Sequence, residues 1–405
     1  MHVALFSPAW PPGRYPNGIV TYVQFMRSEL LAQGHRVSVL SGSVEPGQTD
    51  PDVYEVGATA SERIVGSLAS RLLGRTPSEF DAGKTIASTL KRVHARNPID
   101  VFEMEESFGW AAQVARGSSV PVVCKLHGPA FLTMVDEELR TPYGQEKVHR
   151  EGQGLAQLQA IVSPSRCHLA DTLARYELKP AIAEQVVNPL ALRADAALWD
   201  ATRCDLNTLL FVGRFDKVKG GDLVVRAFQK LLAHKPDLRL VFVGPDGGLV
   251  QPGGKTIHFQ EFVESLNDPA LARAIDYRGR LDSGDVVALR PAALVTIVAS
   301  RRESQGYTAL EAMLQACPVV CTDTSGLGEM IEHGVTGLKA RTEDADDLAA
   351  QVMRIVADPQ LGRRLGLAGR DYVIEHHSPA VVVKQALDVY RRAIALHRAG
   401  PAARG

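Results

Sequence analysis

Short apolar runs alternate with longer segments of helical periodicity along most of this chain. The alternation is typical of βαβ units, in which crossover helices join parallel strands. The expected strands form two series, 2–6, 37–40, 101–104, 120–126 and 160–162, then 208–212, 238–243, 293–298 and 319–322. Helices are expected between them, for example over 20–33, which ends before Gly34. The pattern predicts an α/β protein with two doubly wound units in tandem.

Hydrophobic periodicity lapses between the two series, over residues 188–206. A chain of 405 residues also suits two domains better than one. We therefore expect Rossmann-like domains over 1–190 and 205–377. A last long helix is expected over 379–398, because Ser378 suits an N-cap and Pro379 suits the first helical position.

Composition and charge argue against several classes of function. The 45 basic and 46 acidic residues leave no basic excess for binding nucleic acid. No apolar run approaches the roughly 18 residues that a membrane-spanning helix requires. The N-terminus lacks the basic segment of a signal peptide. We expect a cytoplasmic protein that binds no nucleic acid, with peripheral membrane contact left open.

A basic loop containing glycines follows the first strand of the second series. It holds Gly213-Arg214 and Lys219-Gly220. Parallel sheets bind ligands at the carboxyl ends of their strands, where this loop is expected to lie. Arg214 offers a rigid fork of donors, Lys219 offers a mobile charge, and the glycines let backbone amides approach an anion. The loop predicts a diphosphate site; the alternative is a solvated basic loop.

Two glutamates, Glu303 and Glu311, follow the strand expected over 293–298. A helix is expected over 308–316, with Glu311 in its first turn. The amides of Gly306 and Tyr307 would then face an anion at the helix N-terminus. A carboxylate such as Glu311 can accept two hydrogen bonds, which suits the vicinal hydroxyls of a ribose. Alternatively, both glutamates are surface carboxylates favoured by the helix dipole.

Together the two clusters resemble the family-4 glycosyltransferases, retaining enzymes of the GT-B architecture. The marks of that family are a Gly-Arg loop followed by Lys-Gly, and a Glu-x7-Glu motif that ends in Glu-Ala-Met. In this chain the marks are Gly213-Arg214, Lys219-Gly220, Glu303 and Glu311-Ala312-Met313. The resemblance implies two Rossmann-like domains that face each other across a cleft. The N-terminal domain would bind the acceptor, the C-terminal domain would bind the donor, and helix 379–398 would pack back on the first domain.

The resemblance also assigns roles within the second half. Arg214 and Lys219 would hold the donor diphosphate and neutralise its charge as the sugar leaves. Glu311 would bind the ribose, and Glu303 a hydroxyl of the donor sugar. Further donor contacts would come from Gly306, Tyr307, Thr308, Arg280 and Leu281. The two cations can stabilise the leaving diphosphate, so no metal or cofactor is expected.

In the first half the resemblance rests on Gly18 and His127. The amide of Gly18 would contact the diphosphate, and Asn17, which stands where the family has glycine, tolerates a positive φ. His127 would lie beside the donor sugar, near the reacting carbon; the alternative is a histidine satisfied at a strand end. Glu105 and Glu106 follow another expected strand. They are candidates for binding acceptor hydroxyls, with a solvated face as the alternative.

The sequence thus predicts a retaining, metal-independent transfer of a hexose-type sugar from a nucleotide-diphosphate donor. The acceptor would be a saccharide, a lipid-linked sugar or a small molecule, as in polysaccharide or glycoconjugate biosynthesis. His127, Arg214, Lys219 and Glu303 are the catalytic candidates. Ser304-Gln305 stands where the family often has Pro-Phe, so the identity of the donor sugar does not follow from the resemblance. The alternatives are a nucleotide-sugar epimerase of the same architecture and a catalytically silent nucleotide-binding subunit.

Overall fold

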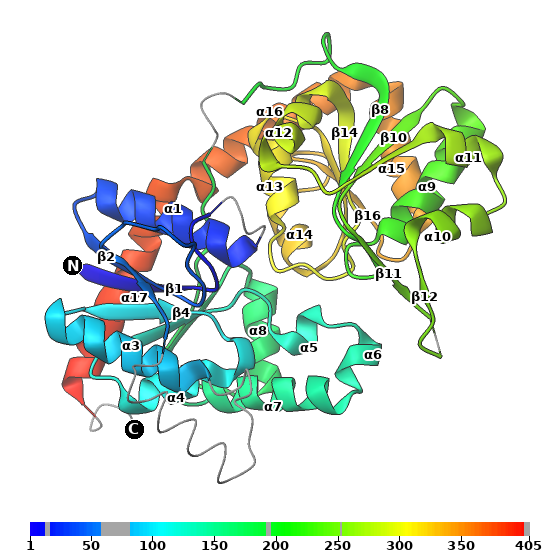
Figure 1. Ribbon diagram of the computed structural model, residues 1–405. Coiled ribbons are helices and arrows are strands. Elements are labelled where there is room, and N and C mark those ends of the chain that lie inside the picture. The colour runs from blue at the N-terminus through cyan, green and yellow to red at the C-terminus, as the bar shows by residue number, and fades with distance from the viewer. Residues whose placement is uncertain (13–16, 58–81, 192–195, 252, 401–405) are drawn as a thin grey trace. The chain divides into compact units, whose positions relative to one another are not determined.

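The computed structural model describes residues 1–12, 17–57, 82–191, 196–251 and 253–400 (Figure 1). The chain divides into two compact units. The first comprises Met1–Pro189 and Pro379–Gly405, and the second comprises Leu190–Ser378. The last long helix therefore belongs to the first unit. Each unit is built around a parallel sheet, so the α/β class is confirmed.

The described part of the first unit contains a parallel sheet of seven strands. These are β1 (His2–Ser7), β2 (Arg36–Ser41), β3 (Val53–Glu55), β4 (Val101–Met104), β5 (Val122–Lys125), β6 (Ala160–Ser163) and β7 (Ile182–Gln185). Their spatial order is β3-β2-β1-β4-β5-β6-β7. The chain proceeds outward from β1 on both sides, so the strand order reverses between β1 and β4. Sheets of this kind bind ligands beyond the carboxyl ends of the strands at such a reversal.

Helices cover both faces of this sheet (Figure 1). The helices in the described part of this unit are α1 (Gly18–Ala32), α3 (Ala82–Arg96), α4 (Trp110–Gly117), α5 (Ala130–Thr133), α6 (Asp136–Leu139), α7 (Pro142–Leu155), α8 (Arg166–Arg175) and α17 (Pro379–Ala399), with a 3₁₀ turn at Ser107–Gly109. Successive residues of a strand point to opposite faces. Val3 and Leu5 accordingly pack with α1 and α17, whereas Ala4 and Phe6 pack with α3, α4 and α7.

A buried polar contact attaches α17 to the sheet. Tyr390 of α17 and Tyr22 of α1 each donate a hydroxyl hydrogen bond of 2.8 Å to the carboxylate of Glu103 in β4. Burial raises the pKa of Glu103, and the nearby Lys125 in β5 opposes that shift. Tyr22, Tyr390 and Glu103 are all buried, and their hydrogen bonds offset the cost of removing these polar groups from water.

The second unit has a six-stranded parallel sheet in its described part. Its strands are β8 (Asp205–Val212), β10 (Arg239–Val243), β13 (Ile275–Gly279), β14 (Ala293–Val298), β15 (Val319–Thr322) and β16 (Leu338–Ala340). Their order is β13-β10-β8-β14-β15-β16, which reverses between β8 and β14. A small separate sheet contains β9 (Phe215–Asp216), β11 (Asp246–Val250) and β12 (Thr256–Ile257).

The helices of this unit are α9 (Gly221–His234), α10 (Phe259–Ser265), α11 (Pro269–Ala274), α12 (Ser283–Ala292), α13 (Tyr307–Leu314), α14 (Ser325–Met330), α15 (Ala345–Ala357) and α16 (Pro359–His377). Helix α12 packs on Leu210 and Val243, while α15 packs on β14 and β15 and lies beside α9 (Figure 1). Within the described residues, no helix is both long and apolar enough to cross a membrane.

Candidate functional site

The two sequence clusters of the second unit lie at the reversal of its strand order. The basic loop follows β8 and the first glutamate follows β14, and these strands are neighbours. Gly220 ends the basic loop with a φ of 70°. A Cβ atom there would lie 1.9 Å from the carbonyl oxygen of Ala299, so the two loops approach closely because residue 220 is glycine.

This approach brings Lys219 and Glu303 together. The Nζ atom of Lys219 lies 2.5 Å from Oε2 of Glu303. Ser300 donates a second hydrogen bond of 3.2 Å to the same oxygen. Arg214 has a different partner, because its Nε lies 2.7 Å from Oδ2 of Asp216, and its side chain is 56% exposed. Each predicted cation is therefore paired with a carboxylate.

The basic loop contributes one residue to a buried cluster of aromatic side chains. Phe215 lies between Arg214 and Asp216 and is fully buried. Its ring contacts those of Phe242 and Phe259, with centroids 6.2 and 5.2 Å away. Phe215 thereby fixes the backbone that carries Arg214, a role that the sequence pattern alone did not reveal.

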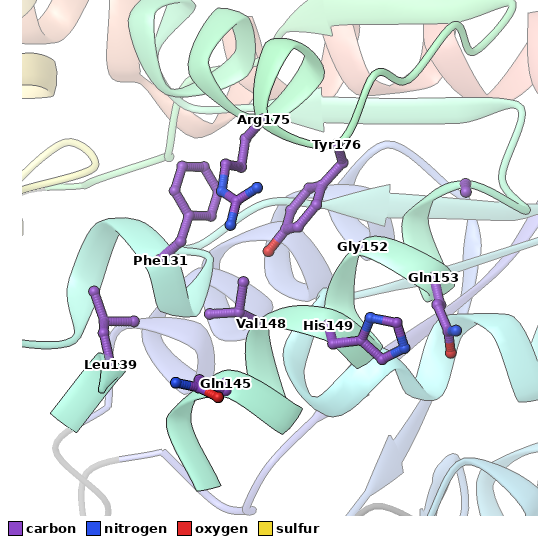
Figure 2. A pocket seen from close by; sticks show the side chains of 10 residues that line it. Phe131, Leu139, Gln145, Val148, His149, Gly152, Gln153, Arg175 and Tyr176 are labelled. Carbon is purple, nitrogen blue, oxygen red and sulfur yellow. The ribbon is translucent and has the colours of Figure 1, made fainter. Parts of the chain in front are cut away.

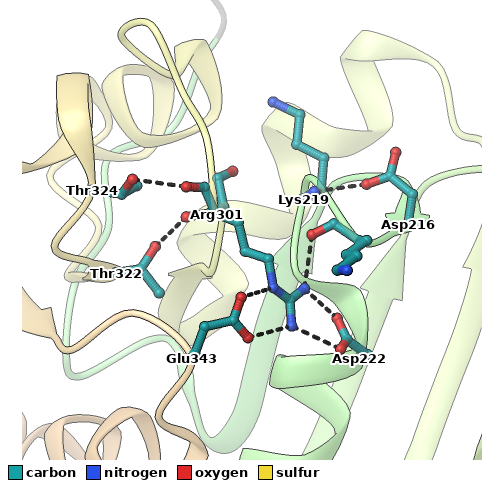
Figure 3. Close-up of polar contacts among 9 residues, drawn as sticks. Asp216, Lys219, Asp222, Arg301, Thr322, Thr324 and Glu343 are labelled. Carbon is teal, nitrogen blue, oxygen red and sulfur yellow. Dashed lines mark hydrogen bonds and ion pairs between the residues drawn. The ribbon is translucent and has the colours of Figure 1, made fainter. Parts of the chain in front are cut away.

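Arg301 ties three segments of the second unit together (Figure 3). Its guanidinium donates to both carboxylate oxygens of Asp222 at 2.6 and 2.9 Å, to Glu343, and to the carbonyl of Lys217 at 2.8 Å. Burial opposes the charge, but the hydrogen bonds to Asp222 and Glu343 outweigh it and raise the pKa of Arg301. Arg301 holds the loop after β14 against the basic loop. Sequence analysis assigned it no role, although it lies two residues before Glu303.

Helix α13 begins one residue earlier than the sequence indicated. Gly306 is its N-cap, with a φ of 76°, and Tyr307 is its first residue. The prediction that Glu311 lies in the first turn is therefore wrong, because the left-handed Gly306 starts the helix sooner. Glu311 instead forms an ion pair with Arg290 of α12. The Arg290 side chain is 2% exposed and that of Glu311 is 37% exposed, so a buried cation holds a carboxylate that solvent still reaches.

The remaining donor candidates of this unit lie nearby or at the sheet edge. Thr308 follows Tyr307 in the first turn of α13. Arg280 and Leu281 follow β13, the edge strand two positions from β8. A hydrogen bond of 2.8 Å from the amide of Gly244 to the carbonyl of Gly279 joins the ends of β10 and β13. Leu281 packs into the cluster beneath α12, and Arg280 is exposed.

Replacing Gly220 by alanine is expected to destabilise the second unit by about 2–4 kcal/mol. A left-handed residue with a Cβ costs roughly 1–2 kcal/mol, and the overlap with Ala299 adds roughly 1–3 kcal/mol of backbone displacement. Gly334→Ala is the matched control, since Gly334 has a φ of 81° but its added Cβ would meet nothing within 4 Å. Urea unfolding of both variants measures the difference. Equal losses would show that the two loops do not need this close approach.

In the first unit, Gly18 and His127 lie at loops that follow β1 and β5. Gly18 is the first residue of α1. Asn17 before it is extended, with a φ of −137°, and its side chain accepts a 2.8 Å hydrogen bond from the amide of Ile19. The expected use of a positive φ at Asn17 is therefore wrong, because this residue serves as the N-cap of α1 instead.

The carboxylate of Glu106 holds the backbone of the His127 loop. It accepts hydrogen bonds from the amides of His127, at 2.9 Å, and Gly128, at 2.7 Å. The ring of Tyr22 meets the imidazole edge-to-face, with centroids 5.0 Å apart. Burial, with a smaller contribution from the charge of Lys125, lowers the pKa of His127 to about 3. The imidazole is therefore neutral at neutral pH and can hydrogen-bond a hydroxyl without bringing a charge.

The acidic candidates of the first unit are interior groups. Glu105 and Glu106 are 4% and 2% exposed, so the alternative of a solvated face is wrong. Glu105 accepts a hydrogen bond from the amide of Ser107, and Glu106 accepts one from the amide of His127. Burial, with the neighbouring Glu106, raises the pKa of Glu105 to about 7. Glu151, which sequence analysis missed, is also buried, and burial raises its pKa to about 8.

Two Rossmann-like units with polar loops at their strand reversals define the GT-B class of fold. Solved structures share it along nearly the whole chain. Sucrose-phosphate synthase from Thermosynechococcus elongatus has a TM-score of 0.70 and 23% identity, and the alignment covers 97% of this chain and 99% of that one. HepE from Anabaena, in complex with UDP-glucose, has a TM-score of 0.66 and 15% identity, with 96% and 99% covered.

Family comparisons then specify the kind of GT-B protein. Residues 17–190 match the family described as "Glycosyl transferase 4-like domain", and residues 201–372 match "Glycosyl transferases group 1". A D-inositol 3-phosphate glycosyltransferase from Nocardiopsis dassonvillei is 27% identical over 420 residues, which cover 95% of this chain and 92% of that protein. The chain belongs to the family-4 type of glycosyltransferases.

Proposed function

We propose that this protein transfers a hexose-type sugar from a nucleotide-diphosphate donor to an acceptor, with retention of anomeric configuration and without a metal ion. The observation that carries the proposal is the Lys219–Glu303 pair at 2.5 Å, at the strand reversal of the second unit. A lysine paired with a replaceable carboxylate is suited to exchange that partner for a diphosphate. The released carboxylate is then free to accept hydrogen bonds from a sugar.

The donor is bound by groups of the second unit. Arg214 and Lys219 contact the diphosphate, and each charge-assisted bond contributes roughly 1.5–3 kcal/mol. Glu303 accepts a hydrogen bond from a sugar hydroxyl. Glu311, oriented by Arg290, accepts hydrogen bonds from the ribose hydroxyls. The cations become more important as the sugar leaves, because negative charge then accumulates on the diphosphate oxygen.

The first unit binds the acceptor and supplies His127. Its neutral imidazole hydrogen-bonds the donor sugar, and Glu106 fixes its backbone. An acceptor hydroxyl oxygen forms the new bond to the anomeric carbon as the bond from that carbon to the diphosphate breaks. The hydroxyl proton passes to the departing diphosphate oxygen on the same face. The products are a glycoside and a nucleoside diphosphate.

Similar proteins suggest the first substrates to test. HepE was solved with UDP-glucose, so UDP-glucose is the first donor. One relative is named for D-inositol 3-phosphate and one structural neighbour for sucrose phosphate, so a phosphorylated small molecule is the first acceptor class. A peripheral membrane site is needed only if the acceptor is linked to a lipid.

Thermal unfolding in EDTA, against UDP, GDP, ADP and dTDP, tests the donor site. A nucleotide at about a hundred times its Kd should add roughly 2.7 kcal/mol to the stability of the protein, which raises the unfolding midpoint by several degrees. Lys219→Ala should reduce this shift. Lys217→Ala, in the same loop, should keep it. Absence of a shift with every nucleotide would overturn the donor site. A shift without sugar transfer to any acceptor would favour a silent nucleotide-binding subunit, and sugar-nucleotide conversion without any acceptor would favour an epimerase.

A further inference from the structure

The first unit contains a cavity that none of the proposed donor contacts uses. It has a volume of about 650 Å³, within the range of small-molecule sites. Helices α5, α6, α7 and the end of α8 surround it (Figure 2). Its apolar walls come from Phe131, Leu139, Val148 and Ala156, together with the ring of Tyr176.

Two polar groups at this cavity have no hydrogen-bond or ion-pair partner among the described residues. The hydroxyl of Tyr176 is buried and has no hydrogen-bond partner among the described residues. Burial and the neighbouring Glu151 raise the pKa of Tyr176, so the hydroxyl remains a donor. Arg175 lies over the Tyr176 ring, 5.9 Å from its centroid, and no described carboxylate forms an ion pair with it. Figure 2 shows both side chains extending from the end of α8 into the same space.

The position of Tyr176 is built into the packing of neighbouring helices. A Cβ atom on Gly152 of α7 would lie 2.4 Å from Cδ1 of Tyr176, so the ring rests on α7 because residue 152 is glycine. Phe131 meets the same ring edge-to-face, with centroids 5.3 Å apart. A buried hydroxyl without a partner costs about 1–3 kcal/mol. A ligand that accepts its hydrogen bond would remove that cost.

The cavity also lies close to the reacting region proposed above. Phe131 follows His127 by four residues, a span of at most about 14 Å. A molecule that fills the cavity can therefore extend toward His127. Its apolar body would contact the helices, and its negative charge would meet Arg175 and the Tyr176 hydroxyl.

We propose that this cavity binds the non-reacting part of the acceptor, a small soluble molecule with an aryl or medium-chain acyl body and one carboxylate or phosphate. The link to the acceptor rests on the proposed function, whereas the binding itself does not. The cavity would thus determine acceptor specificity by selecting an apolar group beside an anion. Arg175 and Tyr176 are the residues that recognise the anion.

Binding of 8-anilinonaphthalene-1-sulfonate to the intact protein, without nucleotide, tests the site. Arg175→Gln should weaken this aryl anion about tenfold, because one charge-assisted contact is lost. The same variant should leave the uncharged analogue N-phenyl-1-naphthylamine unaffected. Arg96→Gln is the matched control, since Arg96 is also an exposed arginine in the last turn of a helix of this unit.

Two further variants separate recognition from folding. Tyr176→Phe should weaken the anion several-fold without lowering the unfolding midpoint, because the hydroxyl it removes has no partner. Val148→Trp should fill the cavity and abolish binding of both dyes. Octanoate should displace the dye from the wild-type protein and act as a competitive inhibitor against the acceptor.

The outcomes distinguish the cavity from the proposed reaction. Equal anion binding by wild type, Arg175→Gln and Val148→Trp would overturn the cavity proposal even if UDP stabilises the protein. Arg175-dependent binding without any nucleotide effect would support the cavity and overturn its link to the acceptor. Arg175-dependent sedimentation with phosphatidylglycerol vesicles, with no octanoate binding, would overturn the soluble ligand in favour of a membrane lipid.

Discussion

Replacing Lys219 by alanine is expected to lower kcat/KM for sugar transfer by a factor of about 10 to 100. The variant loses one charge-assisted contact with the diphosphate, worth roughly 1.5–3 kcal/mol, and each 1.4 kcal/mol corresponds to about tenfold in rate. The loss should fall on kcat as well as on donor KM, because charge accumulates on the leaving diphosphate during the reaction. Initial rates of nucleoside diphosphate release, measured with the preferred acceptor, provide the test.

A control variant and a stability measurement distinguish a role of Lys219 in the donor site from a purely structural role. Lys217→Ala removes an exposed lysine from the same loop and should leave kcat/KM within about twofold of wild type. Lys219→Ala also leaves Glu303 without its lysine partner, so a purely structural role would lower thermal stability. Partly exposed ion pairs contribute only about 0–1 kcal/mol, so little change in the unfolding midpoint is expected. Unchanged catalysis with a large loss of stability would contradict a role in the donor site.

The sheet could be predicted from sequence where strands are buried on both faces. Strands expected over 101–104, 293–298 and 319–322 have those bounds in the structure. The prediction missed β3, β7, β13 and β16, which are the four edge strands of the two parallel sheets. An edge strand needs fewer apolar residues because only part of it is covered, so its hydrophobic pattern is weak.

Site residues could be predicted where their motif lies within one chain segment. Contacts between residues of distant segments could not. The pairing of Lys219 with Glu303 joins residues 84 positions apart and depends on the close approach at Gly220. Arg290 is equally invisible in sequence, because α12 reaches Glu311 only in the folded unit. The acidic run at Glu105 was noticed, but local composition favoured a solvated face. Its position after a fully buried strand at the reversal of strand order was the better guide.

Glu151→Gln is expected to stabilise the first unit at pH 8 by about 4 kcal/mol and to have little effect near pH 4.5. Glu151 is 1% exposed, and its Oε2 accepts a 2.7 Å hydrogen bond from the amide of Ala130. Burial, reinforced by the charge of Glu106, raises its pKa from 4.5 to about 8. Glutamine keeps an oxygen for the Ala130 amide and carries no charge at any pH.

The pH dependence of this stability change follows from proton binding by Glu151 in the folded and unfolded states. Between pH 4.5 and 8 the folded protein keeps the Glu151 proton and the unfolded chain releases it. The stability that this group contributes is therefore complete below pH 4.5 and is lost as the pH rises through 8, at about 1.4 kcal/mol per pH unit. Glu151→Gln should remove this dependence from the urea midpoint followed by the fluorescence of Trp10 and Trp110. Glu146→Gln, an exposed glutamate on the same helix, should keep the wild-type slope. An equal stability change at every pH would mean that Glu151 is charged in the folded protein, and that the interior beneath His127 is more polar than its burial implies.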